Sequence, residues 1–364
     1  MRTLSVILLL VLCVACRNTE APLSMDCSQY TMNQTDDRYA IGVSAQYAGV
    51  LHDRIIQAGG CNFPDIPAAD GGSKVYYDAI YAATLPLGHE AWTKIGKLPV
   101  PAAYGATACY GNSLYFIGGQ SADGPLKSVF RLSLQEGEAT LEQLPDLPYA
   151  VDNATCAVGA DGFYLIGGNT DGQPSGAGLH YTLGSDSSIR VLPSLPDGNR
   201  LQAVSAVVDN QLFVMGGYCP PSPDKEGYLQ DACYRLEGDN WIRIATPTDA
   251  SGQIVSFSGG CAIAMDDHQI LCVGGVNRSI FPIGLNGVEK GKTWLSHPVE
   301  WYQFNRRVMI YNTQTDTWTQ IGEHEGAARA GAALVRNRNS YFVLQGEIMP
   351  GIRTPKITEI KIKP

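Results

Sequence analysis

The 364 residues carry a formal net charge of −9, only 17% charged side chains and 40 glycines. A chain of this length exceeds what one simple hydrophobic core usually covers, so repeats or several domains are expected. The acidic balance argues against a general nucleic-acid surface but leaves room for a local basic pocket. Many glycines with few charges favour short strands joined by tight turns, so we expect an all-β protein.

Residues 1–16 have the pattern of an export leader. Met1-Arg2 precedes an apolar run over 4–14 that is too short for a permanent membrane helix. The run ends in Val14-Ala15-Cys16, which resembles a bacterial lipoprotein cleavage site, although Cys13 stands where such sites usually carry Leu. We expect Cys16 to become the lipidated first residue of a periplasmic protein that meets a membrane only through this anchor. An ordinary signal peptide cut nearby is the alternative.

Export would place the remaining cysteines where disulfides are permitted. Cys219 and Cys233 flank a loop between two expected strands, so they could form a local bridge, although spacing alone does not determine pairing. The eight cysteines after the leader form no Cys-x-x-Cys motif, and the six histidines of the sequence are scattered. We therefore expect neither a metal site nor a cofactor.

One pattern occurs six times after the leader. Each copy has an apolar strand rich in small residues, a polar turn, and a second apolar strand ending in Gly-Gly or, in the last copy, Gln-Gly. Further strands follow in most copies, and several copies close on a tryptophan, which predicts four-stranded units. The copies cover residues 42–60, 103–119, 152–168, 201–217, 258–275 and 329–346.

The spacing of these copies resembles that of kelch repeats. The final glycines stand at 60, 119, 168, 217, 275 and 346, near the period of about 50 residues expected for kelch blades. The resemblance covers nearly all of residues 39–364 and implies a six-bladed kelch-type β-propeller. The longer steps place long loops on one face after the first, fourth and fifth copies.

The sixth copy ends one strand short of a full unit. A propeller must close its ring to avoid an unpaired sheet edge. We expect residues 17–38 to act as a linker in which part of 24–38 pairs as the missing outer strand of the sixth sheet.

The turn after each second strand and the connection into each first strand should emerge on the same face. The residues directly after the final glycines are Cys61, Gln120, Asn169, Tyr218, Val276 and Glu347, of which only Glu347 is charged. The residues that enter the first strands include Tyr104, Asn153, Arg200, Ser258 and Arg329. A carboxyl group and several arginines around one concavity form a candidate site.

The loop over residues 345–354 is the most informative part of that face. Pro350-Gly351 favours a turn that brings Glu347 and Arg353 to one side. A surface ion pair that only stabilises the loop is the alternative explanation.

This loop, QGEIMPGIRT, and the segment VGGVNRSIF (273–281) resemble the matching loops of bacterial N-acetylneuraminate epimerases, the kelch-type sialic-acid mutarotases. The resemblance implies that Glu347 is the acid/base and Arg353 the binder of the sugar carboxylate. Arg200, Arg278, Arg329 and Asn277 are further binding candidates, although arginines at strand ends are usually solvated or paired and Asn277 could instead cap a turn. The Glu-bearing loop lies near the C-terminus rather than in mid-chain, as in the cyclically permuted mutarotases.

The implied reaction interconverts the anomers of N-acetylneuraminate through an open-chain ketone, and the acidic sugar would be the ligand. Three alternatives differ in class. A non-catalytic carbohydrate- or protein-binding propeller would need no acid/base. A sialidase would carry Ser-x-Asp-x-Gly-x-x-Trp boxes, which are absent from the sequence, and a copper oxidase would need histidines placed as ligands.

Overall fold

The computed structural model describes residues 23–34, 36–88, 92–184 and 187–363. The leader and Cys16 lie outside the described residues. Within those residues, no helix is both long enough and apolar enough to cross a membrane.

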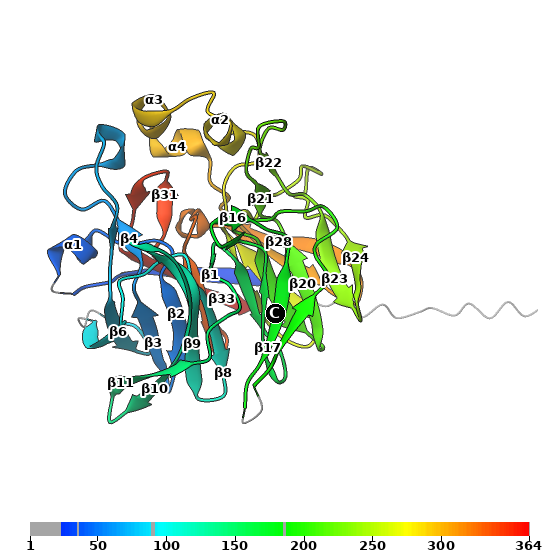
Figure 1. Cartoon of the computed structure of the whole chain (residues 1–364). Coiled ribbons are helices and arrows are strands. Elements are labelled where there is room, and N and C mark those ends of the chain that lie inside the picture. The colour runs from blue at the N-terminus through cyan, green and yellow to red at the C-terminus, as the bar shows by residue number, and fades with distance from the viewer. Residues whose placement is uncertain (1–22, 35, 89–91, 185–186, 364) are drawn as a thin grey trace, which may run out of the picture.

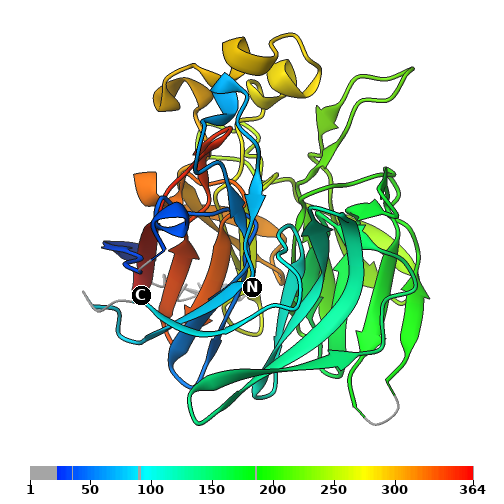
Figure 2. The ribbon, with the colours of Figure 1, turned by 60° about the vertical axis from the view of Figure 1, so that its left-hand side comes forward.

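The chain folds into antiparallel sheets with little helix, an all-β arrangement consistent with a β-propeller (Figures 1 and 2). Within the described ranges, six sheets have four strands each, and we number them one to six in chain order. From the inner to the outer strand, sheet one consists of β2 (Tyr47–Leu51), β3 (Arg54–Ala58), β6 (Ala79–Thr84) and β7 (Thr93–Lys97), and sheet two of β8 (Ala106–Tyr110), β9 (Ser113–Ser121), β10 (Gly124–Gln135) and β11 (Glu138–Leu144). In the same order, sheet three consists of β13 (Thr155–Val158), β14 (Gly162–Ile166), β17 (Gly178–Thr182) and β18 (Ile189–Leu192), and sheet four of β19 (Val204–Val208), β20 (Gln211–Met215), β23 (Cys233–Glu237) and β24 (Asn240–Ile244). Sheet five consists of β25 (Cys261–Ala264), β26 (Gln269–Val273), β27 (Arg307–Asn312) and β28 (Thr317–Glu323), and sheet six of β29 (Ala333–Asn337), β30 (Ser340–Leu344), β33 (Lys356–Lys363) and β1 (Ser24–Thr31).

The sixth sheet joins the two ends of the described chain. β1 pairs antiparallel with β33 along its whole length, from Ser24 opposite Lys363 to Thr31 opposite Lys356. The outer strand of this sheet therefore comes from residues 24–31, within the segment that sequence analysis expects to supply it. Without β1, the outer edge of β33 would offer unpaired backbone groups to other chains.

The hydrophobic core is divided among the interfaces between neighbouring sheets. Separate buried clusters join sheets one and two, two and three, three and four, four and five, five and six, and six and one. Trp241 and Trp318 donate indole hydrogen bonds to Pro193 O and Ala245 O, at the end of the preceding sheet. Each sheet thus packs on the next, and the last packs on the first.

A closed cycle of backbone hydrogen bonds links the segments that enter the six inner strands. Each N–H donates to the carbonyl of the preceding segment at 2.7–2.9 Å, and the cycle runs through Ala45, Tyr104, Asn153, Gln202, Gly259 and Gly331 before returning to Ala45. All six residues have φ between 49° and 70°. Because this left-handed conformation costs about 1–2 kcal/mol for a non-glycine residue, four of the six positions are strained and are held by the cycle.

Short hairpins and helices gather at one end of the sheets, which we call the loop face (Figure 1). The helical segments are α1 (Asp37–Ala40), η1 (Ala68–Asp70), α2 (Phe281–Leu285), α3 (Gly291–Leu295), α4 (Val299–Tyr302) and η2 (Glu325–Ala327). The short strands are β4 (Cys61–Asn62) with β5 (Val75–Tyr76), β12 (Val151–Asp152) with β15 (Asn169–Thr170) and β16 (Gln173–Pro174), β21 (Tyr218–Cys219) with β22 (Tyr228–Leu229), and β31 (Glu347–Met349) with β32 (Ile352–Arg353). Figure 2 shows α2, α3 and α4 above the sheets at this end.

Candidate functional site

The loop face has an equivalent backbone pairing in all six sheets. The residue that follows each final glycine pairs with the residue just before the hydrogen-bonded cycle. The pairs are Ser44 with Cys61, Ala103 with Gln120, Asp152 with Asn169, Leu201 with Tyr218, Ser258 with Val276 and Ala330 with Glu347. The two sets of residues therefore share one face, around the axis of the cycle, which we call the mouth.

Glu347 and Arg353 lie opposite each other on the hairpin β31–β32. Pro350 and Gly351 form its turn, and Gly351 has φ 83°, a conformation that favours glycine. Arg353 Nη2 is 2.6 Å from Glu347 Oε1. The sequence therefore places this acid–arginine pair correctly, and the structure positions it at the mouth.

The burial of this pair is unequal. The Arg353 side chain is only 2% exposed, whereas that of Glu347 is 24% exposed. Arg353 also donates from Nε to Ser44 Oγ at 3.1 Å, and its guanidinium lies 4.9 Å from the centre of the Phe63 ring. Burial acts to lower the pKa of Arg353, but Glu347, Cys61 and Tyr104 together outweigh it, so the pKa is raised. Arg353 is thus a charged support beneath a partly exposed carboxylate.

Three further groups extend this cluster along the mouth. Tyr104 lies in the hydrogen-bonded cycle, and its hydroxyl accepts from Cys61 Sγ at 3.5 Å and from Lys74 Nζ at 2.7 Å. Lys74 is exposed and lies in the long loop between β4 and β5. Burial, and after it the nearby Cys61 and Glu347, raises the pKa of Tyr104 well above its usual range.

Arg200, which sequence analysis expects to bind the ligand, is enclosed by the protein in this structure. Its side chain has 0% exposure. The guanidinium is bonded to Asp197 at 2.5 Å and to the carbonyls of Gly216 and Ala232. Arg200 enters the fourth sheet one residue before Leu201, and its side chain joins this entering segment to two loop-face carbonyls of the same sheet.

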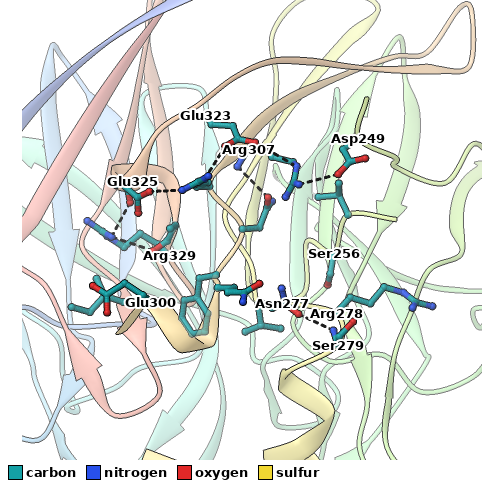
Figure 3. A pocket seen from close by; sticks show the side chains of 18 of the residues that line it. Asp249, Ser256, Asn277, Arg278, Ser279, Glu300, Arg307, Glu323, Glu325 and Arg329 are labelled. Atoms are coloured by element: carbon teal, nitrogen blue, oxygen red, sulfur yellow. Dashed lines mark hydrogen bonds and ion pairs between the residues drawn. The ribbon is translucent and has the colours of Figure 1, made fainter. Parts of the chain in front are cut away.

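The other three binding candidates line a separate cavity of about 1070 Å³ on the loop face (Figure 3). Arg278 is paired with Asp231 through two hydrogen bonds. Asn277 caps a turn, because its Oδ1 accepts from the N–H groups of Ser279 and Ile280 at 2.8 and 3.1 Å. Of the two interpretations that the sequence allowed for Asn277, the structure shows the turn-capping contacts.

Arg329 is 7% exposed and donates Nη1 to the carbonyls of Glu325 and Ala328. Burial lowers the pKa of Arg329 to about 10, although Glu325 acts in the opposite direction. Arg306 and Arg307 also line this cavity, but both pair with acidic residues that line it too. Ile348, the neighbour of Glu347, is part of the wall, whereas neither Glu347 nor Arg353 is. The cavity adjoins the mouth without containing the acid–arginine pair.

Sequence reasoning missed a second carboxyl group at the mouth. Asp152 is 5% exposed, and its Oδ1 accepts from Asn153 Nδ2 at 2.5 Å and Asn169 Nδ2 at 2.7 Å. In a cycle of six sheets, the third lies opposite the sixth, so Asp152 and Glu347 are on opposite sides. Asp152 would have been identified if both residues of each backbone pair had been considered, and not only the residue after each final glycine.

Cys219 and Cys233 are both free thiols, so the local bridge considered for them does not form in this structure. Cys233 is buried in the core strand β23, whereas Cys219 lies in the loop-face strand β21. Among the described residues, no three His, Cys, Asp or Glu side chains come together in a way that could hold a metal ion.

Comparisons with known proteins identify similarity over the last three fifths of the chain. Residues 144–364 match the family model described as N-acetylneuraminate epimerase. An N-acetylneuraminate epimerase of Salmonella enteritidis is 29% identical over 228 residues, which cover 59% of this chain and 57% of the relative. An N-acetylneuraminate epimerase of Haemophilus influenzae is 31% identical over 231 residues, which cover 59% and 58%.

The matches span less than two thirds of the length of these relatives. A solved structure of YjhT aligns with a TM-score of 0.49 and 23% identity, and the alignment covers 59% of this chain and 64% of that one. Glu347, Arg353 and the whole hairpin β31–β32 lie inside the matched residues.

Proposed function

The chain belongs to the N-acetylneuraminate epimerase family, and from this premise we propose that it interconverts the anomers of N-acetylneuraminate by acid/base ring opening at the mouth. The observation that carries the proposal is the pairing of Glu347 with Arg353 on the hairpin β31–β32. In this pair, Glu347 is a partly exposed carboxyl group that can carry a proton. It lies on a short hairpin within the residues that match the family model. Similarity to the named relatives supports the choice of sugar.

Glu347 is the group that exchanges a proton with the sugar. The reaction removes the proton of the anomeric hydroxyl while the bond between the anomeric carbon and the ring oxygen breaks, and closing the ring reverses both changes. A positioned carboxyl group typically accelerates such proton transfers about 10²–10⁴-fold. That gain is adequate for a reaction that already proceeds in water.

The position of Arg353 changes the role that sequence analysis expects for it. A side chain that is 2% exposed and already bonded to Glu347 is poorly placed to bind the sugar carboxylate directly. We propose that it orients Glu347 through a charge-assisted hydrogen bond. Arg353 and Lys74 together exceed the charge of Glu347 by one unit, which favours an anionic sugar at this side of the mouth.

We also propose that the six four-stranded sheets are the blades of a kelch-type β-propeller. The six inter-sheet cores, the closed hydrogen-bond cycle and the pairing of β1 with β33 support this assignment. The equivalent positions that surround the mouth then correspond to one kelch repeat each.

The first prediction concerns Glu347→Gln, which keeps the side-chain shape but removes the proton carrier. We expect the catalysed rate of anomer exchange to fall at least about 10²-fold while binding of N-acetylneuraminate changes less than about tenfold. The measurement is proton NMR of freshly released α-N-acetylneuraminate with and without the full chain.

Glu138→Gln is the matched control, since it makes the same change at an exposed glutamate on the outer strand β11. It should leave the rate unchanged. Full activity in Glu347→Gln would make this residue a loop-stabilising partner only. A wild-type protein that accelerates no anomer exchange would instead favour a non-catalytic carbohydrate-binding propeller.

A further inference from the structure

The hydrogen-bonding state of Tyr104 points to a second proton carrier at the mouth. A phenol hydroxyl has one hydrogen to donate and two lone pairs that accept. The Tyr104 oxygen accepts from Lys74 Nζ at 2.7 Å and from Cys61 Sγ at 3.5 Å. Lys74 can only donate, whereas Cys61 Sγ, whose one hydrogen is also within reach of Ser44 O at 3.8 Å, can instead accept from the phenol. Because a thiol sulfur is a weak acceptor, the Tyr104 hydrogen can be donated to a bound ligand instead.

The surroundings of Tyr104 connect it to Glu347 through a continuous cluster. Cys61 contacts Tyr104 and pairs through its backbone with Ser44, which in turn accepts from Arg353 Nε at 3.1 Å. The ring of Phe63 lies near the two cations Arg353 and Lys74. The Arg353 guanidinium is 4.9 Å and Lys74 Nζ is 6.0 Å from the ring centre. Glu347 and Arg353 both act on the pKa of Tyr104, the first raising it and the second lowering it.

The backbone at Tyr104 has a conformation that is unusual for a bulky residue. Its φ is 60°, and its N–H and C=O both belong to the hydrogen-bonded cycle. Such strain is retained when the surrounding structure holds it, and it is frequent at functional sites. Here this backbone conformation holds the Tyr104 ring beside the ammonium of Lys74, and Lys74 Nζ lies 4.7 Å from the ring centre.

We propose that Tyr104 is a second catalytic residue, which donates a proton to the ring oxygen of the sugar while Glu347 takes the proton of the anomeric hydroxyl. Lys74 is a positioning residue that stabilises the phenolate formed on Tyr104. This inference rests on the proposed function and names the group that serves the other half of the same reaction.

The step balances without a co-reactant. Glu347 removes the anomeric O–H proton, and that O–H electron pair forms the carbonyl bond. The bond from the anomeric carbon to the ring oxygen breaks, and the ring oxygen keeps the electron pair and takes the Tyr104 proton. After rotation of the open chain, the Tyr104 phenolate takes this proton back while the ring oxygen attacks the other carbonyl face, and Glu347 returns its proton to the carbonyl oxygen.

The direction of transfer follows from relative basicity. Tyr104 stays protonated at neutral pH because burial raises its pKa, so it is available as a donor before ring opening. An alkoxide leaving group is a stronger base than a phenolate, so the transfer becomes favourable as the ring bond breaks. The fixed ammonium at 2.7 Å stabilises the developing negative charge where it forms.

The test compares Tyr104→Phe with Tyr110→Phe in the NMR assay with N-acetylneuraminate. Tyr110 is the matched control, since its hydroxyl bonds to Ala160 O at the exposed end of β8. We expect Tyr104→Phe to lower kcat about 10²-fold with KM changed less than threefold, and Tyr110→Phe to match the wild type. Lys74→Met should lower kcat about tenfold, and Lys74→Arg should recover most of it, because it restores a charged donor.

Each outcome decides the proposal. If Glu347→Gln is inactive but Tyr104→Phe keeps its rate within twofold, Tyr104 is not a proton carrier and Glu347 acts alone. If the wild type itself is inactive, both the proposed function and this inference are wrong. Should Tyr104→Phe fail to fold by circular dichroism, the Lys74 pair decides, and equal rates for Lys74→Met and the wild type would overturn the inference.

Discussion

At the scale of single residues, exposure separates arginines of the same sequence class. Arg200, Arg278, Arg329 and Arg353 all occur near the loop face, yet Arg200 is fully buried and Arg278 is paired with Asp231 at the surface. A guanidinium that is already paired with a carboxylate does not exchange this partner for a ligand without cost. Within the predicted acid–arginine pair, Glu347 is the more accessible member, because Arg353 is buried.

Arg200→Met should destabilise the protein without impairing the reaction. The substitution leaves Asp197, which is 22% exposed, without its cation and frees two backbone carbonyls. We expect a loss of about 2–4 kcal/mol in the free energy of unfolding, measured by urea denaturation.

The control is Arg190→Met, which removes an exposed arginine paired with exposed Asp239. Surface pairs of this kind contribute at most about 1 kcal/mol, so little change is expected. If folded Arg200→Met lost anomer exchange at saturating sugar, Arg200 would have a role at the mouth that its burial does not explain.

At the scale of elements, β1 completes the sixth sheet although it lies more than 300 residues from its partner in the sequence. From Ser24 to Ser28 its side chains alternate between exposed and half-buried positions, as expected for an outer strand with one covered face. Met25 and Cys27 pack against the cluster that joins sheets five and six. The strand thus contributes an interface as well as hydrogen bonds.

Met25→Asp and Ser28→Asp test this contribution on one strand. Met25 faces the cluster between sheets five and six, whereas Ser28 is exposed. Placing a carboxylate among apolar side chains should cost about 2 kcal/mol or more, and Met25→Asp should lower the thermal midpoint by several degrees.

Ser28→Asp should change stability by less than about 0.5 kcal/mol. Differential scanning calorimetry distinguishes the two variants. Equal midpoints for both would show that β1 contributes no packing energy and that its pairing with β33 is dispensable for the ring.

At the scale of the whole molecule, stability depends on six interfaces of the same kind between neighbouring sheets. Each interface buries side chains from two sheets, so the hydrophobic core consists of several small clusters instead of one large cluster. Thiols and phenols buried there are neutral in the folded state. We therefore expect the protein to be sensitive to alkaline pH.

Thermal stability should fall as pH rises above about 9. Burial raises the pKa of Cys233 from 9.0 to about 12 and that of Cys272 well above 9.0, both in the core between sheets four and five. Below pH 9 both states keep these protons. Above it the unfolded chain loses them first, so each thiol reduces stability by up to about 1.4 kcal/mol per pH unit until its folded pKa is reached.

The measurement is a series of melts from pH 7 to 11 with a reductant present. Replacing Cys233 and Cys272 by Ala should lower stability at pH 7 but make the decline above pH 9 shallower. A decline that stays equally steep in the double variant would assign it to other groups, such as the buried tyrosines.

The sequence by itself determined the repeated hairpins, the common face of the post-glycine residues and the approach of Glu347 to Arg353. These features depend on local rules: alternation of apolar residues, glycine at left-handed positions, and a short turn between paired strands. It also predicted that residues 24–38 contain the closing strand, because a missing strand leaves an edge that must be paired.

Only the tertiary structure decided which further side chains reach the mouth and how exposed each one is. Asp152 and Lys74 reach this region from different sheets and loops, and their positions depend on closure of the cycle rather than on spacing along the chain. Only the tertiary structure shows that Arg200 is fully buried and that Arg353 is far less exposed than Glu347. Such differences arise from which neighbours fill the space around a guanidinium, and one-dimensional patterns do not contain that information.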